Sequence, residues 1–246
     1  MKKLLMNIAA VALAVAVVAP AAAQRPNTLT SAEQRAGWKL LFDGQSFGQW
    51  RKYAADAMPE QWSIDREHSA MKLATNTARP GSMQGADIMF AGQQFSNFEV
   101  SIDWMIEKGG NSGIMYYVVE EQGKPMYNAA PEVQVLDNWY AGDNKLANHL
   151  AGSLYDIKSA LPQNAKPAME WNTIVIRVDN GNVTHTQNGV VVCEYTLWTP
   201  EWAELVSRSK FKDWPGFNAG PAKTGYIGLQ DHGYAVWFRN IKVREL

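Results

Sequence analysis

Phe98-Glu-Val-Ser-Ile-Asp-Trp-Met-Ile106 is the clearest structural signal in this chain. Apolar side chains stand at alternate positions from Phe98 to Ile106, and Glu99, Ser101 and Asp103 lie between them. Successive side chains of a strand point to opposite faces of a sheet, so this alternation indicates a strand with one face in a core. The stretch therefore predicts a sheet with one apolar and one polar face.

Three alternating runs follow downstream, at Trp171–Val178, Asn182–Gln187 and Val190–Tyr195. The turn pairs Asn180-Gly181 and Asn188-Gly189 separate them. Asn and Gly accept the positive φ that tight hairpins need. The spacing predicts a three-stranded antiparallel meander.

Shorter runs predict strands at 62–64, 70–74, 86–90, 113–119, 132–136, 153–156, 225–230 and 235–244. Thr199 followed by Pro200 predicts a helix that ends near Ser207, with Thr199 as its N-cap. A short helical turn is also expected around Ser31–Arg35. Many short strands with a single short helix predict an all-β fold, a two-sheet antiparallel β-sandwich of the jelly-roll type.

Composition excludes several classes of partner. The 246 residues carry a formal net charge of −1, with 23 basic and 24 acidic side chains. This balance gives no basic footprint for nucleic acid or for an anionic membrane surface. Ten Trp, nine Tyr and eight Phe are many for such a chain. They fit a ligand that stacks on flat rings, such as a sugar, and they fit a β core equally well.

The N-terminus has the pattern of a secretory signal peptide. Met1-Lys-Lys is followed by the apolar stretch Leu4–Val18 and by small residues that end at Ala23, which predicts cleavage before Gln24. A lipid anchor would need a cysteine at the cleavage point, but the single cysteine is Cys193. A mature protein without a membrane span or lipid anchor is therefore expected in the periplasm or outside the cell.

The chain that follows the expected signal peptide is predicted to form one domain. Residues 1–24 form the expected signal peptide, 25–36 an extended lead-in and 37–246 a single β-sandwich, because no linker interrupts them. With one cysteine there is no internal disulfide, and Cys193 is expected at a buried strand position.

Glu132-Val-Gln-Val-Leu-Asp137 is the most informative polar segment. Val133 and Val135 are expected to point into the core, which leaves Glu132 and Gln134 on the opposite face. A bulge near Leu136 would bring Asp137 to the same face. The spacing resembles the Glu-x-Asp-x-x-Glu motif of jelly-roll retaining glycosidases, with an amide in place of the middle acid. A polar outer face followed by a turn explains the pattern equally well.

Other polar groups lie in turns. Lys108–Gly113 reads as a tight turn in which Asn111 offers amide hydrogen bonds. His149 and His232 also lie in turns among acids and amides, whereas His68 and His185 are expected to be ordinary surface residues. No His-x-His or His-x-x-x-His pair appears, so the sequence assigns no metal ligands.

Several segments together resemble the 3-keto-disaccharide hydrolase family. They are Trp38–Gly44 with Trp50, Phe98–Trp104, Gly109–Gly113, Glu132–Asn138, Ala151–Asp156, Glu170–Asn172, His185–Gly189, and Gly228–Gly233 with Phe238–Lys242. The resemblance covers the chain from about residue 37 to its end. It implies a concanavalin A-like jelly roll that cleaves the glycosidic bond of 3-keto-glycosides.

A ketone at C3 acidifies the C2 proton of such a sugar, so a base removes it and the C1 substituent leaves by β-elimination before water adds. This chemistry needs a base, a proton donor and a group that stabilises the enolate. Under the resemblance, Glu132 is expected to be the base and His149 the acid or enolate stabiliser, and Asp137 is expected to bind hydroxyl groups or orient this catalytic pair. The residues expected to bind or orient the substrate are Asn111, Tyr116, Gln134, Asp156, Gln230 and His232.

No cofactor is assigned with certainty, and a divalent cation is an alternative to His149 as electrophile. The expected partner is a small saccharide, and the expected state is a monomer or a weak homo-oligomer. Two alternatives stay open. One is a non-catalytic carbohydrate-binding module with this fold, and the other is a retaining glycosidase that uses Glu132 and Asp137.

Overall fold

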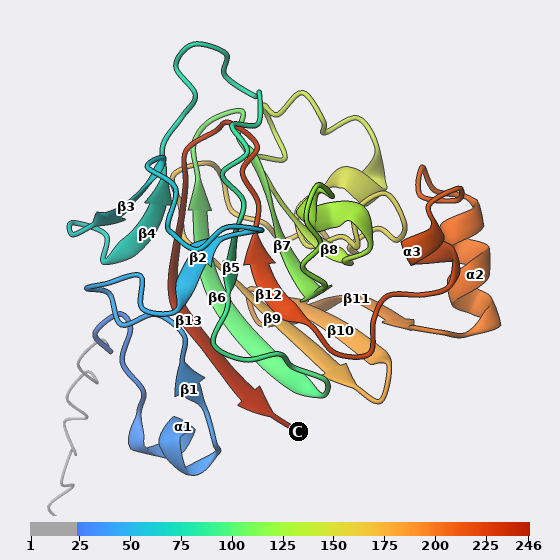
Figure 1. Ribbon diagram of the computed structural model, residues 1–246, viewed down its shortest axis with the longest axis horizontal. Coiled ribbons are helices and arrows are strands. Elements are labelled where there is room, and N and C mark those ends of the chain that lie inside the picture. Colours follow the sequence, from blue (N-terminus) through green and yellow to red (C-terminus); the bar gives the residue numbers. More distant parts are fainter. Residues whose placement is uncertain (1–23) are drawn as a thin grey trace, which may run out of the picture.

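The structure, a computed structural model, describes residues 24–246 (Figure 1). The predicted signal peptide lies outside the described residues, apart from Gln24. Within residues 24–246, no helix combines the length and the apolar character that crossing a membrane requires.

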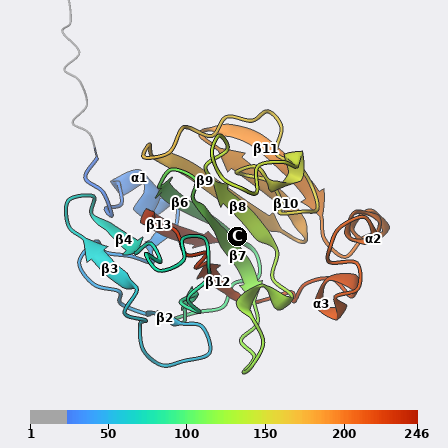
Figure 2. The same ribbon diagram turned by 90° about the horizontal axis from the view of Figure 1, so that it is seen from above.

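Two antiparallel sheets confirm the predicted β-sandwich (Figure 2). The larger sheet has the order β11 (Val190–Thr196), β10 (Asn182–Gln187), β9 (Asn172–Asp179), β6 (Phe98–Ile106), β13 (Val236–Glu245), β4 (Ala70–Leu73) and β3 (Trp62–Asp65), and β1 (Lys39–Leu40) also pairs with β13. The smaller sheet has the order β2 (Trp50–Lys52), β5 (Ile88–Phe90), β12 (Tyr226–Leu229), β7 (Asn111–Val118) and β8 (Glu132–Leu136).

The core fills the space between the sheets, as the alternation along β6 predicts. Phe98, Val100 and Ile102 are fully buried there. The predicted meander is present as β9, β10 and β11, with Asn180 and Asn188 at positive φ in the two turns. Cys193 is buried on β11, as expected.

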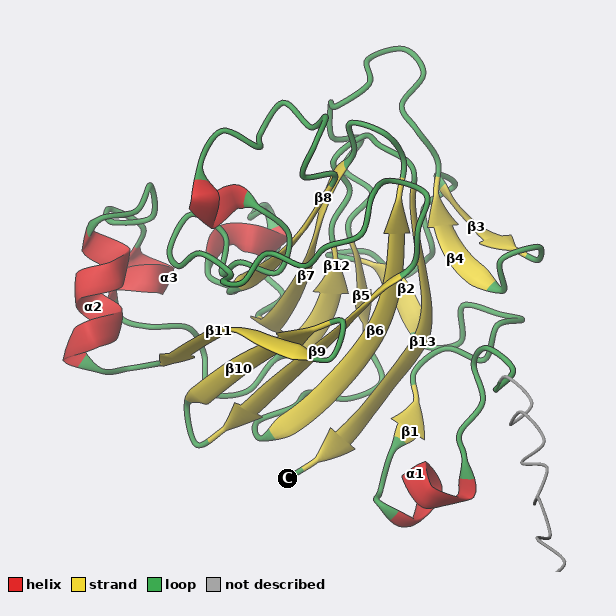
Figure 3. Cartoon of the chain, turned by 180° about the vertical axis from the view of Figure 1, so that it is seen from behind, coloured by secondary structure: helices red, strands yellow, loops and turns green. Residues whose placement is uncertain are grey.

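Three α-helices and two short 3-10 helices, Met126–Asn128 and Ala147–His149, are present among the described residues, where the sequence predicted one helix and a helical turn. Figure 3 draws the helices in red. α1 (Ser31–Arg35) corresponds to the predicted turn, and α2 (Pro200–Ser207) begins after its N-cap Thr199, as predicted. α3 (Pro215–Asn218) was not predicted, because a single turn leaves no hydrophobic period to detect.

Other expectations are corrected. Residues 153–156 form no strand and make only isolated bridges through Leu154, and the segment expected to be a turn at 108–113 already enters β7 at Asn111. His185 is fully buried rather than on the surface, because its ring contacts the Gly152 carbonyl and the Tyr195 hydroxyl. β8 pairs with β7 in regular register, so the bulge expected near Leu136 is absent.

The outer face of the smaller sheet is where polar and apolar side chains meet. β7 and β8 send Ile114 and Val133 into the core, while Met115 lies on the opposite face in a separate small apolar cluster. The long segment between β8 and β9 and the helices α2 and α3 lie on the β8 side of the molecule (Figure 1). These segments supply walls to the outer face.

Candidate active site

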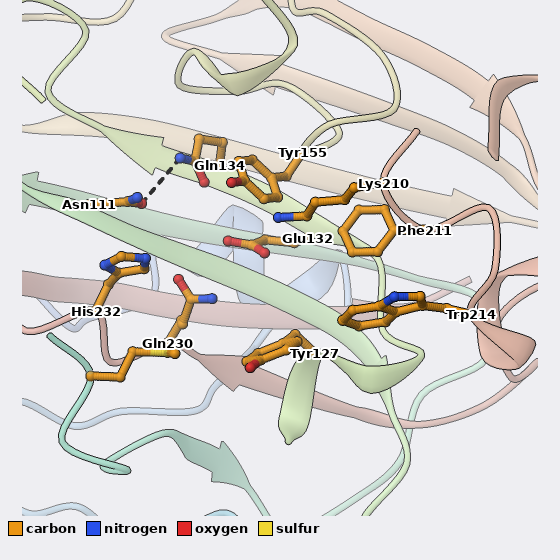
Figure 4. A pocket seen from close by; sticks show the side chains of 11 residues that line it. Asn111, Tyr127, Glu132, Gln134, Tyr155, Lys210, Phe211, Trp214, Gln230 and His232 are labelled. Atoms are coloured by element: carbon orange, nitrogen blue, oxygen red, sulfur yellow. Dashed lines mark hydrogen bonds between the residues drawn. The ribbon is translucent and has the colours of Figure 1, made fainter. Parts of the chain in front are cut away.

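A pocket of about 300 Å³ lies on the outer face of the smaller sheet. It is lined by Met83, Asn111, Tyr127, Glu132, Gln134, Tyr155, Lys210, Phe211, Trp214, Gln230 and His232. β7 and β8 supply the floor, and the segments after β12, before β9 and after α2 supply the walls (Figure 4). Figure 4 shows the Glu132 carboxylate near the centre, with the Lys210 amine pointing toward it.

The sheet register explains why the floor has this shape. Met115 pairs with Glu132 and Gly113 pairs with Gln134, so these four residues share one face. The carboxyl group of Glu132 lies over Gly113, where a Cβ atom would come within 2.1 Å of Glu132 Oε1. Because glycine lacks this atom, the carboxylate occupies the space that a side chain on β7 would fill.

Glu132 is only 7% exposed, and no hydrogen bond to its carboxylate is present among residues 24–246. Burial raises the pKa of Glu132 from 4.5 to about 8, the Lys210 charge opposes the shift, and the charges of Asp87 and Asp143 add to it. A carboxyl group with this pKa is well suited to exchange a proton near neutral pH.

Unpaired polar atoms surround Glu132. Gln134 Nε2 donates to Asn111 Oδ1 at 3.1 Å, but Gln134 Oε1 has no partner among the described residues. Gln230 Oε1 and His232 Nδ1 are likewise buried without a partner in the described part of the chain. Buried polar groups are normally hydrogen-bonded, so these atoms are available to bind water or a polar ligand in the pocket.

The opposite wall is aromatic. The Tyr127 and Trp214 rings lie 6.1 Å apart, and the Phe211 and Trp214 rings meet edge to face at 5.2 Å. Lys210 Nζ lies over the Tyr155 ring, 4.1 Å from its centroid. Flat apolar faces opposite hydrogen-bonding groups suit the two surfaces of a sugar ring.

The structure brings together five of the residues singled out in the sequence, Glu132, Gln134, Asn111, Gln230 and His232. His149 does not line the pocket. Its two ring nitrogens each lie 2.7 Å from a carboxylate oxygen, of Asp143 and of Asp156, so neither nitrogen is free for a ligand. The expectation that Glu132 and His149 share one cavity is therefore corrected.

His149 and Asp156 instead support the pocket from behind. Asp156 Oδ2 accepts a hydrogen bond from the main-chain nitrogen of Lys210, and Asp143 Oδ2 accepts one from the Tyr155 hydroxyl. The His149 ring also packs on the Tyr155 ring, at 4.5 Å between centroids. This network supports Tyr155 and Lys210 from behind, and Asp156, which was expected to bind the substrate, does not line the pocket around Glu132.

Asp137 and Tyr116 are also misplaced by the sequence interpretation. Asp137 lies past the end of β8, where its two oxygens accept hydrogen bonds from the main-chain nitrogens of Gly109 and Trp139, and it borders a different cavity. Without a bulge, strand alternation turns it away from Glu132. Tyr116 faces the core, fully buried, and pairs with the Tyr195 hydroxyl.

Sequence reasoning missed Met83, Tyr127, Tyr155, Lys210, Phe211 and Trp214. Apart from Met83, and from Tyr155 in the segment expected to be a strand, these residues share one signal, since they are aromatic or basic side chains in segments with no strand alternation. The run Phe211-Lys-Asp-Trp214 is the densest example. Aromatic residues without a sheet to pack in are candidates for a ligand surface.

The raised pKa of Glu132 predicts a pH-dependent stability. The folded state holds this proton more tightly than the unfolded chain, so stability is expected to fall as pH rises from about 4.5 to about 8. Over this pH range the free energy of unfolding is expected to fall by at most about 5 kcal/mol. In urea unfolding, Glu132→Gln is expected to match the wild type at pH 4 and to exceed it by about 2 kcal/mol at pH 9. If the difference in the free energy of unfolding between Glu132→Gln and the wild type were the same at pH 4 and pH 9, the raised pKa assigned to Glu132 would be wrong.

Comparisons with known proteins agree with the fold and the pocket. The sequence profile of the 3-keto-alpha-glucoside-1,2-lyase-like domain matches residues 37–244. A 3-keto-disaccharide hydrolase from Bacteroides thetaiotaomicron is 43% identical over 233 residues, which cover 85% of this chain and 79% of the relative.

Solved structures give the same architecture. A proposed glycosyl hydrolase from Parabacteroides distasonis has a TM-score of 0.78 at 25% identity and covers 90% of this chain and 100% of its own. The β-glucanase of Bacillus licheniformis has a TM-score of 0.50 at 11% identity, with 85% of this chain and 97% of its own covered, and it shows the shared concanavalin A-like fold alone.

Fold, pocket and relatives together define an enzyme that cleaves glycosidic bonds on a jelly-roll scaffold. The resemblance detected in the sequence is thereby confirmed. The chain belongs to the family of the 3-keto-alpha-glucoside-1,2-lyase-like domain.

Proposed function

We propose that this enzyme cleaves 3-keto-disaccharides and related 3-keto-glucosides by β-elimination followed by hydration. The Glu132 carboxylate takes the C2 proton, and the C2–H electrons form an enolate with the C3 ketone. The enolate then collapses to a C1=C2 double bond as the C1–O bond breaks and the leaving oxygen takes a proton. Water adds its oxygen to C1 and a proton to C2, which gives net hydrolysis.

One observation carries this proposal. Glu132 is the single carboxylate among the residues that line the pocket, and its pKa is raised to about 8. Conventional glycosidases use two carboxyl groups, about 5 Å apart when they retain configuration and about 6.5–9.5 Å apart when they invert it. Elimination needs one base only, so the composition of the pocket favours it. The 43% identical relative named 3-keto-disaccharide hydrolase supports the substrate class.

The remaining groups of the pocket fit the other roles. The Lys210 ammonium and the amide of Gln134 or Gln230 are able to stabilise an enolate oxygen, because they present N–H donors beside Glu132 (Figure 4). His232, with a free Nδ1, is our candidate for the proton donor to the leaving oxygen. These residues replace His149, whose ring nitrogens are engaged by Asp143 and Asp156.

A divalent cation was the alternative electrophile expected from the sequence. Among residues 24–246, no group of three or more His, Cys, Asp or Glu side chains is arranged to hold a metal ion, and the pocket offers only Glu132 and His232 of these types. The donors present do not fit a dedicated metal site, so no step is derived through a cation. Its involvement stays a separate hypothesis.

The function is tested by incubating the purified mature protein with 3-keto-trehalose and following the products by NMR, with and without a chelator. The proposal expects release of glucose and a 3-keto sugar. A protein that binds this compound without cleaving it would be a carbohydrate-binding module, and cleavage of trehalose itself would favour a conventional glycosidase. Loss of activity with chelator alone would support the cation hypothesis.

The position of Asp137 distinguishes elimination from the mechanism of a retaining glycosidase that uses Glu132 and Asp137. About 17 Å of extended chain lies between residues 132 and 137, and Asp137 holds main-chain groups instead of facing the pocket. Asp137→Ala is expected to lower the free energy of unfolding by about 2 kcal/mol, since two N–H groups lose their acceptor. The kcat of the folded variant should stay within about threefold of wild type. A thousandfold loss without unfolding would return Asp137 to the chemistry.

We also propose that the protein acts outside the cytoplasm. The support is the signal-peptide pattern from Met1 to Ala23, and N-terminal sequencing of the exported protein, expected to start at Gln24, tests it. A monomer or weak homo-oligomer stays the prediction for the assembly state, which light scattering measures.

A further inference from the structure

A second cavity adjoins the pocket on the β5 side of the same sheet. Its volume is about 340 Å³, and it shares Met83 and Tyr127 with the pocket around Glu132. One carboxylate, Asp87, and two lysines, Lys52 and Lys124, also line it. The two cavities are therefore neighbours, with Met83 and Tyr127 at their junction.

The sheet register links Asp87 to the floor of the pocket. Leu229 pairs with Ile88, so the next residues along these antiparallel strands, Gln230 and Asp87, face each other across β12 and β5. The main-chain nitrogen of Asp231 donates to Asp87 Oδ1 at 2.8 Å. Gln230 in turn donates through its main-chain nitrogen to the carbonyl of Gly113, which pairs with Gln134 on β8. One row of residues thus runs across the sheet from Gln134 to Asp87.

Asp87 has capacity for a ligand. Among residues 24–246, its side chain makes one hydrogen bond, to the Asp231 main chain. Burial raises the pKa of Asp87 to about 7; the hydrogen bond from the Asp231 main chain and the Lys52 charge oppose the shift, and the Asp231 charge adds to it. Near neutral pH the group is present in both protonation states, so it is able to accept a hydrogen bond from a hydroxyl group or donate one.

Size argues for two sugar-binding subsites. The pocket around Glu132 is at the lower end of the usual 300–1,000 Å³ range of small-molecule sites, which suits one sugar ring better than two. A disaccharide needs a second volume beside the first, and the Asp87 cavity is of similar size. Its carboxyl group and lysines offer the acceptors and donors that the hydroxyl groups of a sugar require.

We infer that the Asp87 cavity is the subsite for the leaving sugar of a disaccharide substrate, while the keto-sugar ring lies over Glu132. The glycosidic bond then lies at the junction formed by Met83 and Tyr127. This inference rests on the proposed function and adds to it that the enzyme recognises the second sugar through Asp87. A glycoside with a small leaving group leaves this subsite empty.

The test compares 3-keto-trehalose with methyl 3-keto-α-glucoside, whose leaving group is methanol. Asp87→Ala is expected to raise KM for 3-keto-trehalose about tenfold, the effect of one lost hydrogen bond to a charged or strongly polar group. KM for the methyl glycoside should stay within twofold. Asp87→Asn, which keeps hydrogen-bonding capacity, should restore most of the loss. Glu60→Ala, at an exposed site away from both cavities, is the matched control.

Equal effects on both substrates, or no effect on either, would overturn the subsite. Wild-type protein that cleaves neither compound would instead contradict the proposed function. Should Asp87→Ala fail to fold, Lys124→Ala at an exposed position tests the same cavity, with an expected threefold rise in KM for 3-keto-trehalose only. Free glucose, the sugar released from 3-keto-trehalose, should compete with that substrate in the wild type, and its failure to do so also counts against the subsite.

Discussion

Glu132→Gln is expected to lower kcat for 3-keto-trehalose at least a thousandfold while the Kd for the same substrate stays within about threefold. The amide has the shape of the carboxyl group but cannot take the C2 proton, and general-base catalysis contributes about 10²–10⁴-fold in rate. Because the Glu132 carboxylate makes no hydrogen bond to described residues, its replacement leaves the surrounding side chains in place. Single-turnover kinetics and isothermal titration calorimetry measure the two quantities.

Glu60→Gln is the matched control for this variant, since Glu60 is exposed and does not line the pocket. It should keep wild-type kcat. If Glu132→Gln keeps more than a tenth of wild-type kcat, Glu132 is not the base. If Kd rises in step with the loss of kcat, Glu132 is a binding residue and the base lies elsewhere.

Gly113→Ala is expected to lower kcat about a hundredfold with little loss of stability. The new methyl group would lie 2.1 Å from Glu132 Oε1, so the carboxylate must move to another rotamer. A displacement of about 1 Å at a reacting group commonly costs on the order of 10²-fold in rate. The free energy of unfolding should change by less than about 2 kcal/mol, because the flexible end of a side chain gives way rather than the backbone. Enzyme kinetics and urea unfolding measure both effects.

Gly142→Ala is the matched control, since a Cβ there meets no atom within 4 Å. It should leave both kcat and stability unchanged. A Gly113→Ala variant with wild-type kcat would mean that the position of the Glu132 carboxylate over β7 is unimportant, which would contradict the geometry assigned to the active site.

The sheets were largely predictable because their signal is local. Alternation predicted both ends of β6 and of β8 correctly, and the two Asn-Gly turns predicted the meander of β9, β10 and β11. β1 and β2 escaped detection, since two or three residues are too few to show a period.

The site was most predictable where it lies on the sheet, although Gln230 and His232, just past the end of β12, were also singled out. Alternation alone sets Glu132 and Gln134 on one face, and both line the pocket. His149 ends a short 3-10 helix and Asp137 lies just past β8, where the direction of each side chain depends on hydrogen bonds to other segments, through partners such as Asp143 and Gly109. The aromatic wall from Phe211 to Trp214 depends on how the segment after α2 folds back, which no local pattern determines.

The fate of the C2 hydrogen tests the central claim most directly. The substrate is 3-keto-trehalose carrying deuterium at C2 of the keto ring, cleaved in ordinary water and followed by NMR. Elimination through Glu132 predicts that the released 3-keto sugar carries hydrogen at C2 in proportion to the bonds cleaved. A product that retains its deuterium, formed at the same rate as the product of the unlabelled substrate and without an unsaturated C1=C2 intermediate, would show that the C2–H bond does not break during cleavage, and the account of Glu132 as the base would be wrong.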